Sequence, residues 1–493
     1  MIRDIFNDIV EQKDIRQNLI KLKAELKDGF NKTALLYQIG SDYSIFDKLL
    51  LNEDAKVRKN TALIMGELGV PSFLTKLYDA YNNEEQLFVK SSYLVALKNF
   101  DYNILIPKFK ERLEYLSSLT VDDNNKKHIS EEIRVLSDLI IEKEGVKPHK
   151  FTGYNIPSTL VLLTNRNYKD ITLNSLSSYK AKEFNAGVIV KADNISEILD
   201  IRTYSEILFM LDELRVCEND PLEAANAIAH SELIEFLGKR HKGDEPYYFR
   251  IELKSKLELD KKSAFTKKLS SEIERLTGRK LINSTSNYEF EIRLIENKEG
   301  KYNILVKLYT IKDDRFFYRI NSTATSIAPV SAALIANLAK EYLVEERRIL
   351  DPFCGVGTML IERHKLVKAN TMYGLDVSAD AIKKAKDNTE AAHLIAHYIN
   401  RDFFDFKHEY LFDEIFTNMP RVMGHKDEDE IFTLYQRFFL KAKEHLERNG
   451  IIVLYSHNKD FVQRLMNRSI YRIEKEFEIS KKEGAYLFVI RYL

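Results

Sequence analysis

The sequence predicts three structural parts: a helical repeat region over residues 1–148, an α+β region over 159–312 and a doubly wound α/β domain over 322–493. In the first part, apolar residues recur every three or four positions, which is the spacing of one helix face. In the second, short β-branched and aromatic runs are separated by helical segments. In the third, strands alternate with helix-length segments around a glycine loop, as in a parallel sheet. A chain of 493 residues is also too long for one core, so several domains are expected.

The composition is that of an ordinary globular protein, with 44% hydrophobic and 30% charged residues. Its 75 basic residues balance 75 acidic ones, so any surface that binds nucleic acid must be a local patch. The two cysteines, Cys217 and Cys354, are too few for a disulfide-stapled secreted protein and cannot form a structural zinc site, so we expect no metal. The first residues, MIRDIFNDIVEQKD, lack the apolar core of a signal peptide, and no stretch reaches the roughly 20 apolar residues of a membrane span. We therefore expect a cytoplasmic protein that does not contact a membrane.

Residues 1–148 are predicted to be helical throughout. Two segments have similar sequences, DAKVRKNTALIMGELG (54–69) and EQLFVKSSYLVALKNF (85–100). Each has a valine followed by a basic residue and then small and apolar residues. The separation of Val57 and Val89 is close to the period of helix-pair solenoids. The region thus resembles HEAT-type repeats, which implies an α-solenoid with a face for a protein or RNA partner. The alternative is an irregular helical domain.

A break at GVKPHKFTGYNIPS (145–158), rich in glycine and proline, predicts a linker before the middle region. The segments TLVLLT, GVIVKA, YYFRIELK, YEFEIRLIE and YNILVKLYT have the composition of strands. Helical segments alternate with them, so an α+β unit is expected. The successive pieces occupy 159–164, 187–192, 205–214, 247–254, 288–296 and 302–310.

The order of these pieces resembles the middle region of THUMP-domain RNA methyltransferases. The matching strings are VLLTNRNYKD, GVIV, RTYSEILFML, PYYFRIEL and NYEFEIRL, which come in the family's order over about 150 residues. The resemblance implies a ferredoxin-like subdomain followed by a THUMP domain, both placed before a catalytic domain. It also implies that this region binds RNA.

Basic residues crowd the segment KSKLELDKKSAFTKKLSSEIERLTGRK (254–280), which we predict to be a helix. A basic helix in a protein without net charge suits contact with RNA phosphates, and THUMP domains are thought to hold an RNA acceptor end. The alternative is a solvated helix face without a partner. The lysines that we expect to contact RNA are Lys261, Lys262, Lys267 and Lys268.

The last part begins with a helix, IAPVSAALIANLAKEYL (327–343), and a short strand, RRIL (347–350), that leads to Asp351. A glycine loop then runs into the next helix. Helix-length segments between the following strands predict a parallel, Rossmann-like sheet, whose ligands bind at the carboxyl ends of the strands. The further strands are expected at 371–376, 396–400, 414–418 and 451–456, with two more at 471–478 and 485–493.

The loop DPFCGVGT (351–358) is the most informative string in the chain. Gly355 and Gly357 can adopt positive φ and let the backbone approach a ligand closely. Thr358 is expected to cap the following helix, whose first amide groups favour an anion. Asp376 ends the next strand, about 20 residues later, where a carboxylate can accept both hydroxyls of a ribose. These features predict a nucleotide-like ligand.

The loop lacks the third glycine of the dinucleotide fingerprint, and no Gly-Lys-Ser/Thr follows it as in a phosphate loop. DPFCGVGTMLIE instead closely resembles the loop that binds S-adenosylmethionine (AdoMet) in THUMP-associated and related RNA methylases. The resemblance implies AdoMet as the cofactor, with Asp402 placed to read its adenine amino group. We assign no nucleophilic role to Cys354, because no histidine with a clear supporting role accompanies it. The expected AdoMet-binding residues are Asp351, Phe353, Cys354, Gly355, Gly357, Thr358, Asp376, Val377, Asp402, Phe403 and Asn418.

The motif Asn418-Met419-Pro420-Arg421 ends the strand at 414–418 and continues beyond it. Methylases of exocyclic amines carry Asn or Asp, a variable residue, Pro and an aromatic at this point. An acceptor side chain and a backbone carbonyl can hold the hydrogens of the amine and aim its lone pair at the methyl group, while the aromatic stacks on a flipped base. Asn418 and Pro420 match this pattern, and Arg421 replaces the aromatic. An arginine plane can also stack on a base, so we expect Asn418, Pro420 and Arg421 to be catalytic; the alternative is a decayed pocket.

The segment VMGHK (422–426) could form the second glycine-containing turn that follows this motif in the THUMP guanine methylases. We expect His425 to lie in a polar loop, because the amine can release its proton to water without a general base.

Together, the resemblances imply an AdoMet-dependent RNA methyltransferase that modifies the exocyclic N2 amine of guanosine in transfer RNA, or alternatively in ribosomal RNA. The basic helix favours RNA over protein as the substrate. Two other hypotheses stay open. Arg421 suggests an inactive protein that binds AdoMet and RNA, and the motif also allows a methylase of adenine or of a protein amide.

Overall fold

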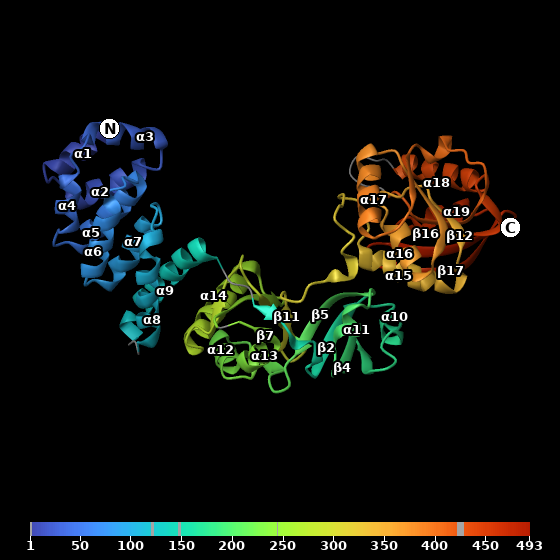
Figure 1. The fold of residues 1–493 in the computed structure, drawn as a ribbon, viewed down its shortest axis with the longest axis horizontal. Coiled ribbons are helices and arrows are strands. Elements are labelled where there is room, and N and C mark those ends of the chain that lie inside the picture. The colour runs from blue at the N-terminus through green and yellow to red at the C-terminus, as the bar shows by residue number, and fades with distance from the viewer. Residues whose placement is uncertain (1, 120–122, 146–148, 244, 422–427) are drawn as a thin grey trace. The chain divides into compact units, whose positions relative to one another are not determined.

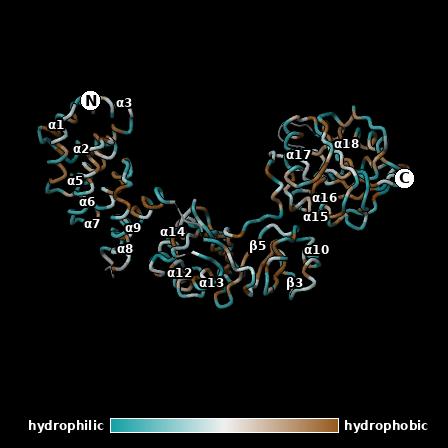
Figure 2. Tube along the Cα trace, viewed as in Figure 1, coloured by the Kyte–Doolittle hydropathy of each residue, from teal (hydrophilic) through white to brown (hydrophobic). Residues whose placement is uncertain are grey.

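A computed structural model describes residues 2–119, 123–145, 149–243, 245–421 and 428–493. The chain divides into two compact units, Met1–Pro148 and His149–Leu493 (Figure 1). Hydrophobic and hydrophilic residues are interspersed along the chain in both units, as Figure 2 shows, and each unit buries hydrophobic side chains in cores of its own. Within the described ranges, every helix is too short or too polar to cross a bilayer.

The N-terminal unit is helical, as predicted. Its helices are α1 (Ile2–Val10), α2 (Ile15–Glu25), α3 (Gly29–Ile39), α4 (Ser44–Leu50), α5 (Ala55–Leu68), α6 (Phe73–Asn83), α7 (Leu87–Leu97), α8 (Ile106–Ser118) and α9 (Asp123–Glu144). Helices α2, α5, α7 and α9 pack against one another in sequence order; α4 packs on α5, α6 on α5 and α7, and α8 on α9. The two similar segments, 54–69 and 85–100, form α5 and α7. These helices approach so closely that a Cβ atom at Gly66 would lie 2.7 Å from Cα of Ala96. The assignment to HEAT-type repeats stays a prediction.

A sheet of nine strands spans the region predicted to be α+β. Its strands are β2 (Ser158–Thr164), β3 (Lys180–Phe184), β4 (Gly187–Ala192), β5 (Tyr204–Met210), β6 (Val216–Cys217), β8 (Tyr247–Lys254), β9 (Leu281–Asn283), β10 (Phe290–Glu296) and β11 (Tyr302–Leu308). Their order is β3-β4-β2-β5-β11-β10-β8-β9, with β6 paired to β11. The other elements of the region are α10 (Lys169–Asn174), α11 (Ser196–Leu199), α12 (Pro221–Ala229), α13 (Leu233–Arg240), α14 (Leu259–Leu276) and a short ladder of β1 (Lys150–Phe151) with β7 (His241–Lys242). The ferredoxin-like and THUMP assignments stay predictions.

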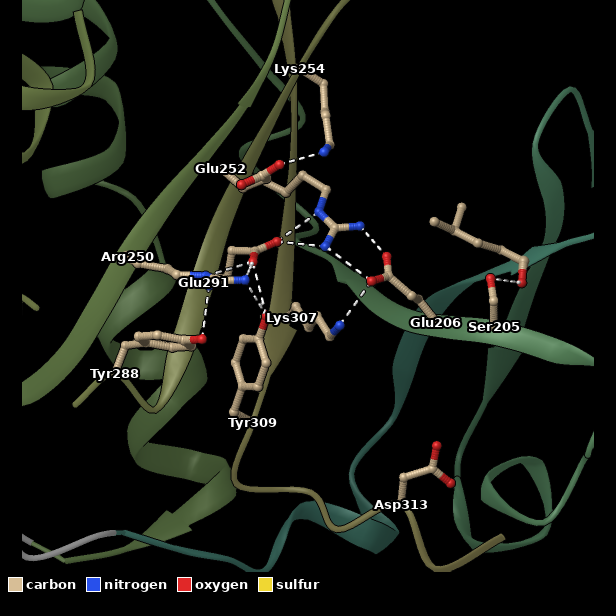
Figure 3. A network of polar contacts seen from close by, with 12 residues as sticks. Ser205, Glu206, Arg250, Glu252, Lys254, Tyr288, Glu291, Lys307, Tyr309 and Asp313 are labelled. Carbon is tan, nitrogen blue, oxygen red and sulfur yellow. Dashed lines mark hydrogen bonds and ion pairs between the residues drawn. The ribbon is translucent and has the colours of Figure 1, made fainter. Parts of the chain in front are cut away.

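Strands β5, β8, β10 and β11 carry a network of charged side chains, shown in Figure 3. Glu291 has no exposed surface and accepts hydrogen bonds of 2.7 Å from both Arg250 and Arg293. Glu206 pairs with Lys307 at 2.9 Å and also with Arg293. Although burial raises the pKa of Glu206, its hydrogen bonds to Arg293 and Lys307 lower it overall to about 2. Both carboxylates therefore stay ionised and bind cations from neighbouring strands, which ties the four strands together.

The strand predicted at 247–254 is confirmed as β8, whereas the helix within the basic segment 254–280 is shorter than that segment. Strand β8 continues to Lys254, and α14 begins only at Leu259. At the other end, Gly278 and Arg279 have φ of +57° and +63°, a backbone conformation that cannot continue a helix. Charged side chains suit any exposed backbone, so the run of basic residues did not reveal where the helix starts or stops.

A sheet of seven strands forms the C-terminal domain. Its strands are β12 (Arg347–Asp351), β13 (Ala369–Asp376), β14 (His397–Asn400), β15 (Phe412–Asn418), β16 (Leu446–Ser456), β17 (Tyr471–Ser480) and β18 (Ala485–Tyr492). Their order is β14-β13-β12-β15-β16-β18-β17; β18 runs antiparallel to both of its neighbours, and the five strands from β14 to β16 run parallel. The helices are α15 (Pro329–Ala339), α16 (Thr358–Leu366), α17 (Ala379–Ala391), α18 (Glu428–Ala442) and α19 (Lys459–Leu465). The Rossmann-like prediction for this domain is confirmed.

Two sets of contacts join the regions of the two sheets. Arg202 binds Glu362 on α16 through hydrogen bonds of 2.9 and 2.6 Å, and Tyr318 donates to the same carboxylate at 2.6 Å. Asn165 donates to the backbone oxygen of Ile479, near the end of β17, at 2.9 Å. Because α16 follows the glycine loop, the first set fixes the middle region to the helix that carries the candidate site.

Candidate active site

The glycine loop lies where the strand order of the C-terminal sheet reverses. Strand β12 ends at Asp351, and the chain passes through residues 352–357 before α16 begins at Thr358. Strands β13 and β14 lie on one side of β12, and β15 and β16 lie on the other. In open α/β sheets such a switch point leaves a crevice at the carboxyl ends of the strands, where ligands bind. The loop therefore occupies the position expected of a ligand site.

The two glycines of the loop are needed for different reasons. Gly355 and Gly357 have φ of +52° and +83°, which favours glycine at both positions. A Cβ atom at Gly355 would meet no atom within 4 Å, whereas a Cβ atom at Gly357 would lie 2.4 Å from the hydroxyl of Tyr398. Gly355 thus borders open space in which a ligand can approach the backbone, and Gly357 lets the loop pack against β14.

Thr358 does not cap α16, contrary to the prediction. The N-cap residue is Gly357, in the left-handed conformation, and Thr358 is the first helical residue. Its hydroxyl accepts a hydrogen bond from Arg319, which also donates to the backbone oxygens of Asn321 at 3.0 Å and Ile327 at 3.1 Å. Thr358 therefore anchors the segment that precedes α15 at the glycine loop. The sequence does not show this contact, because Arg319 lies 39 residues earlier in the chain.

Two carboxylates stand at the ends of neighbouring strands. Asp376, the last residue of β13, accepts hydrogen bonds from the amide of Gly355 at 3.1 Å and from the amide of Ser378 at 2.8 Å. Asp402, shortly after β14, accepts one from the amide of Phe404 at 3.0 Å. A carboxylate offers about four lone-pair sites, so both keep capacity for the hydroxyl or amino groups of a ligand.

A cleft of about 770 Å³ lies at this edge of the sheet, a volume typical of cofactor and substrate sites. The predicted site residues that line it are Phe353, Cys354, Gly355, Thr358, Asp376, Val377, Asp402, Phe403, Asn418, Pro420 and Arg421. Asp351 and Gly357, which we also expected at the ligand, are not among its lining residues. The four lysines expected to contact RNA lie elsewhere, on α14.

Asp351 is buried at the start of the loop and has no exposed surface. Its Oδ1 accepts hydrogen bonds from the hydroxyl of Thr417 at 2.6 Å and from the amide of Phe353 at 3.1 Å. Its Oδ2 has no hydrogen-bond partner in the part of the chain that the structure describes. Burial raises the pKa of Asp351 to about 7; the two hydrogen bonds oppose this rise, and the charge of Asp376 adds to it. Asp351 therefore ties β12 to β15 and supports the loop from within the protein.

Cys354 lines the cleft, yet only 5% of the residue is exposed. Burial raises the pKa of this thiol well above its ordinary value, and the charges of Asp351 and Asp376 raise it further. The reactive form of cysteine is the thiolate, so this neutral thiol is suited to packing rather than to attack.

The motif that begins at Asn418 extends β15 to the cleft. Asn418 pairs with Tyr455 of β16, and the amide of Met419 donates to the backbone oxygen of Tyr455 at 2.9 Å. The hydroxyl of Tyr435 on α18 donates to the backbone oxygen of Pro420 at 3.4 Å. Across the described residues, the carboxamide of Asn418 has no hydrogen-bond partner. The backbone of the motif is thus held on two sides, while the Asn418 side chain stays available to a ligand.

Arg421 is exposed and also lines the cleft. Burial raises the pKa of Tyr455 to about 12, with the charge of Glu483 adding to this rise and the charge of Arg421 opposing it. Arg421 therefore lies close enough to Tyr455 to influence it electrostatically. The turn predicted at 422–426, with His425, falls outside the described residues.

Several lining residues were not predicted: Thr323, Ser326 and Ser331 before the glycine loop, Arg401, Phe404, Leu434 and Arg437 around Asp402, and Tyr455, His457 and Glu483 around Asn418. The first group belongs to a segment without a strand or a motif, so the sequence carried no signal for it. Arg437 comes from α18 and stacks on Phe404 at 3.8 Å, a contact that only the fold creates. Tyr455 and His457 lie at the carboxyl end of a predicted parallel strand, and that rule could have found them.

Comparison with known proteins agrees with this fold. The model of the Methyltransferase small domain family matches residues 323–486. The structure of TrmN from Thermus thermophilus is 19% identical, with a TM-score of 0.51 and coverage of 68% of this chain and 99% of that chain. A predicted N6-adenine-specific DNA methylase from Listeria monocytogenes is 15% identical, with a TM-score of 0.52 and coverage of 68% and 96%. SMU.472, crystallised with SAH, is 14% identical, with a TM-score of 0.53 and coverage of 68% and 98%.

A search of the curated proteins finds no match. The solved structures establish the fold, and the family match identifies the domain that contains the cleft. The open space beside Gly355 and the free lone pairs of Asp376 suit a nucleoside-containing cofactor. Residues 323–486 therefore form a methyltransferase domain, for which AdoMet is the cofactor.

Proposed function

We propose that the protein methylates the exocyclic N2 amine of a guanosine in RNA, with transfer RNA as the substrate and ribosomal RNA as the alternative. The observation that carries this proposal is the carboxamide of Asn418, which lines the cleft and has no hydrogen-bond partner in the described part of the chain. Asn418 is half-buried at the cleft, so its carboxamide is accessible to a ligand that enters there. An amine with two hydrogens is a ligand that its oxygen can bind.

The chemistry requires positioning more than proton transfer. The lone pair of an aryl amine is delocalised into the ring, so the amine is a poor nucleophile until it is aimed. Asn418 can accept one N–H through its side-chain oxygen, and a backbone carbonyl of the same motif can accept the other. AdoMet supplies an electrophilic methyl group when it is bound. Tyr435 and the β15–β16 pairing hold the motif rigid, and Arg421 can stack on the flipped base.

Within this proposal, Asp376 binds the ribose hydroxyls of AdoMet and Asp402 reads its adenine amino group. Asp376 already accepts the amide of Gly355 with one oxygen and that of Ser378 with the other, so its carboxylate is held in place before the cofactor arrives. A pre-oriented acceptor loses little freedom on binding, which increases its contribution to affinity.

Replacing Asp376 with Ala is expected to weaken AdoMet binding by about 1.5–3 kcal/mol, because charge-assisted contacts to two hydroxyls are lost. Titration calorimetry with AdoMet measures this loss. Asp376→Asn keeps an acceptor for the Gly355 amide and separates loss of loop support from loss of ribose binding. Asp380→Ala, on the neighbouring helix α17, is the matched control, since Asp380 pairs with Lys384 and does not line the cleft. Wild-type affinity in Asp376→Ala would refute this placement of the cofactor.

We propose that the middle region, as a ferredoxin-like subdomain and a THUMP domain, binds the RNA through α14. The basic charge of the segment 254–280 is partly compensated, since Arg275 pairs with Glu272 and Arg279 pairs with Glu274. Lys261 lies 3.7 Å from Glu258 at an exposed position. Among the described residues, no ion pair involves Lys262, Lys267 or Lys268. Lys262 and Lys267 are therefore the cations of α14 most available to phosphates, whereas Lys268 lies close enough to Asp220 to interact with it electrostatically. The helices of the N-terminal unit, as HEAT-like repeats, would add a surface for a protein or RNA partner.

Replacing Lys261, Lys262, Lys267 and Lys268 together with Gln should weaken RNA binding and flatten its dependence on salt. Each lost phosphate contact is expected to reduce the slope of log K against log salt concentration by roughly 0.7–0.9. Fluorescence anisotropy at a series of salt concentrations measures the slope, and AdoMet binding should be unchanged. The control replaces the exposed lysines Lys180, Lys182 and Lys191 of β3 and β4. An unchanged slope in the α14 variant would place the phosphate-binding surface elsewhere.

Methyl transfer from tritium-labelled AdoMet tests the function as a whole. Unmodified bulk RNA, DNA and protein are offered separately, and the labelled RNA is then digested to nucleosides for mass spectrometry. The proposal expects label in RNA as N2-methylguanosine. Label in DNA, in N6-methyladenosine or in protein would replace the proposed substrate, and no label in any of them would favour an inactive protein that binds AdoMet and RNA.

A further inference from the structure

His457 is a cleft residue for which the proposed chemistry has no use. It follows β16 directly, is half-buried and lines the cleft together with Tyr455 and Glu483. Its Nδ1 lies 3.1 Å from the backbone oxygen of Glu483. A carbonyl oxygen only accepts hydrogen bonds, so Nδ1 carries the hydrogen of this contact. In the neutral ring the other nitrogen, Nε2, then presents a lone pair.

A buried cluster of hydrogen-bonded hydroxyl groups fixes the backbone on both sides of His457. The hydroxyl of Tyr435 lies 2.8 Å from that of Ser456, and the amide of Asn458 donates to the Ser456 hydroxyl at 2.9 Å. Tyr435 is fully buried and also donates to Pro420. This cluster therefore connects the acceptor motif with the residues on either side of His457. The ring itself is held by its contact with Glu483.

His457 and Asn418 belong to the same end of the cleft. Asn418 is the last residue of β15 and is paired with Tyr455 of β16, so His457 lies two positions beyond the partner of Asn418. Both strands run parallel and end at the same edge of the sheet. In the described part of the chain, neither the Asn418 carboxamide nor Nε2 of His457 has a hydrogen-bond partner. Two unused acceptors thus line the same cleft from the carboxyl ends of adjacent strands.

We propose that His457 is a specificity-determining residue that selects guanine by accepting the N1–H of the target base through Nε2, beside Asn418, which accepts the exocyclic amine. This inference rests on the proposed function and specifies how its base is recognised. Guanine presents two adjacent donors on its Watson–Crick edge, the ring N1–H and the C2 amine. Adenine presents an amine next to a ring nitrogen that carries a lone pair. Two neighbouring acceptors fit the first edge and oppose the second.

The base 2-aminopurine isolates the contribution of His457. It keeps the C2 amine of guanine, but its N1 carries a lone pair in place of a hydrogen and its C6 carries a hydrogen in place of the oxygen. The effect of His457 is therefore obtained by comparing variants. In the wild-type site this lone pair would face that of Nε2, so both would lose a hydrogen bond. Sites built around a hydrogen bond reject substrates that lack the partner group far more strongly than apolar sites reject a change in size.

The experiment uses the full chain and an RNA fragment that contains the guanosine methylated in the bulk assay, synthesised with either guanosine or 2-aminopurine at that position. Single-turnover rates are compared for wild type, His457→Ala and His457→Gln. Wild type should prefer guanosine by about tenfold or more beyond the preference that remains in His457→Ala. His457→Gln, which retains an acceptor oxygen, should recover part of the preference. His397→Gln is the matched control, because His397 lies on the edge strand β14 and does not line the cleft.

Comparing ratios between variants cancels the different intrinsic reactivity of the two amines. A fall in the ratio with unchanged AdoMet affinity supports the assignment, because a general loss of structure would slow both substrates alike. An equal ratio in wild type and His457→Ala overturns the role of His457 and leaves the proposed function intact. A wild-type chain that methylates no guanosine overturns both.

Discussion

Replacing Asn418 with Ala is expected to lower the rate of methyl transfer by about 10²-fold or more, while the affinity for AdoMet stays unchanged. Losing one preorganised polar contact to a reacting group commonly has an effect of this size. Asn418 is suited to such a role because its backbone is fixed by pairing with Tyr455 and its carboxamide has no partner in the described residues. The amine of the substrate would lose the acceptor that aims its lone pair, whereas the cofactor would keep Asp376 and Asp402.

Single-turnover transfer from labelled AdoMet into RNA measures the rate, and titration calorimetry measures the affinity. Asn370→Ala provides a control of the same residue type, because Asn370 is exposed near the start of β13, at the opposite end of the strand from Asp376. N2-methylguanosine in RNA treated with wild type, and its absence with Asn418→Ala, would support the catalytic assignment. Equal labelling by both proteins would show that the cleft binds AdoMet but does not carry out the proposed acceptor chemistry.

The parts of the site that could be predicted from sequence are those with a local cause. Gly355 and Gly357 stand out because few other residues adopt positive φ, and both have it in the structure. Asp376 is identified by its distance from the loop and its place at the end of a buried strand. Most strand ends of the C-terminal domain could be predicted closely, since apolar runs there are bounded by polar residues. The exception is β16, expected at 451–456, which begins at Leu446 because the mostly polar residues in between extend the strand.

The remaining features depend on contacts between distant segments. Thr358 has the residue type of a helix cap, yet Arg319 engages its hydroxyl and Gly357 takes the cap position. Asp351 was expected at the ligand because it stands in the motif, but its partner Thr417 lies 66 residues away and draws it into the core. The pairing of β12 with β15 brings these two residues together, and no local pattern encodes that register.

A second large effect is expected from Asp351, in the dependence of stability on pH. The carboxyl is fully buried, and burial raises its pKa to about 7, whereas an unfolded chain ionises near the ordinary value of 3.8. Between these two values the native state binds a proton that the unfolded state has released. Stability must therefore fall as pH rises through this window, because the native state has to ionise a carboxyl inside the protein. A shift of about three units corresponds to roughly 4 kcal/mol in total.

Asp351→Asn removes this titration and keeps an oxygen that can accept from Thr417 and Phe353. Relative to wild type, the free energy of unfolding of the AdoMet-free variant should therefore rise by about 2–3 kcal/mol between pH 5 and pH 8. Urea unfolding of the two proteins, compared at each pH, cancels the titrations that they share.

Asp413→Asn is the contrasting control. Although burial raises the pKa of Asp413, its hydrogen bonds and ion pairs with Arg348 lower it overall. Its stabilising effect is therefore complete above about pH 5, and the difference from wild type should be flat over the same range. The contrary outcome for Asp351→Asn is a free energy of unfolding, relative to wild type, that does not change between pH 5 and pH 8. That result would show that this carboxyl is ionised at little cost and that its unpartnered oxygen is solvated in the folded protein.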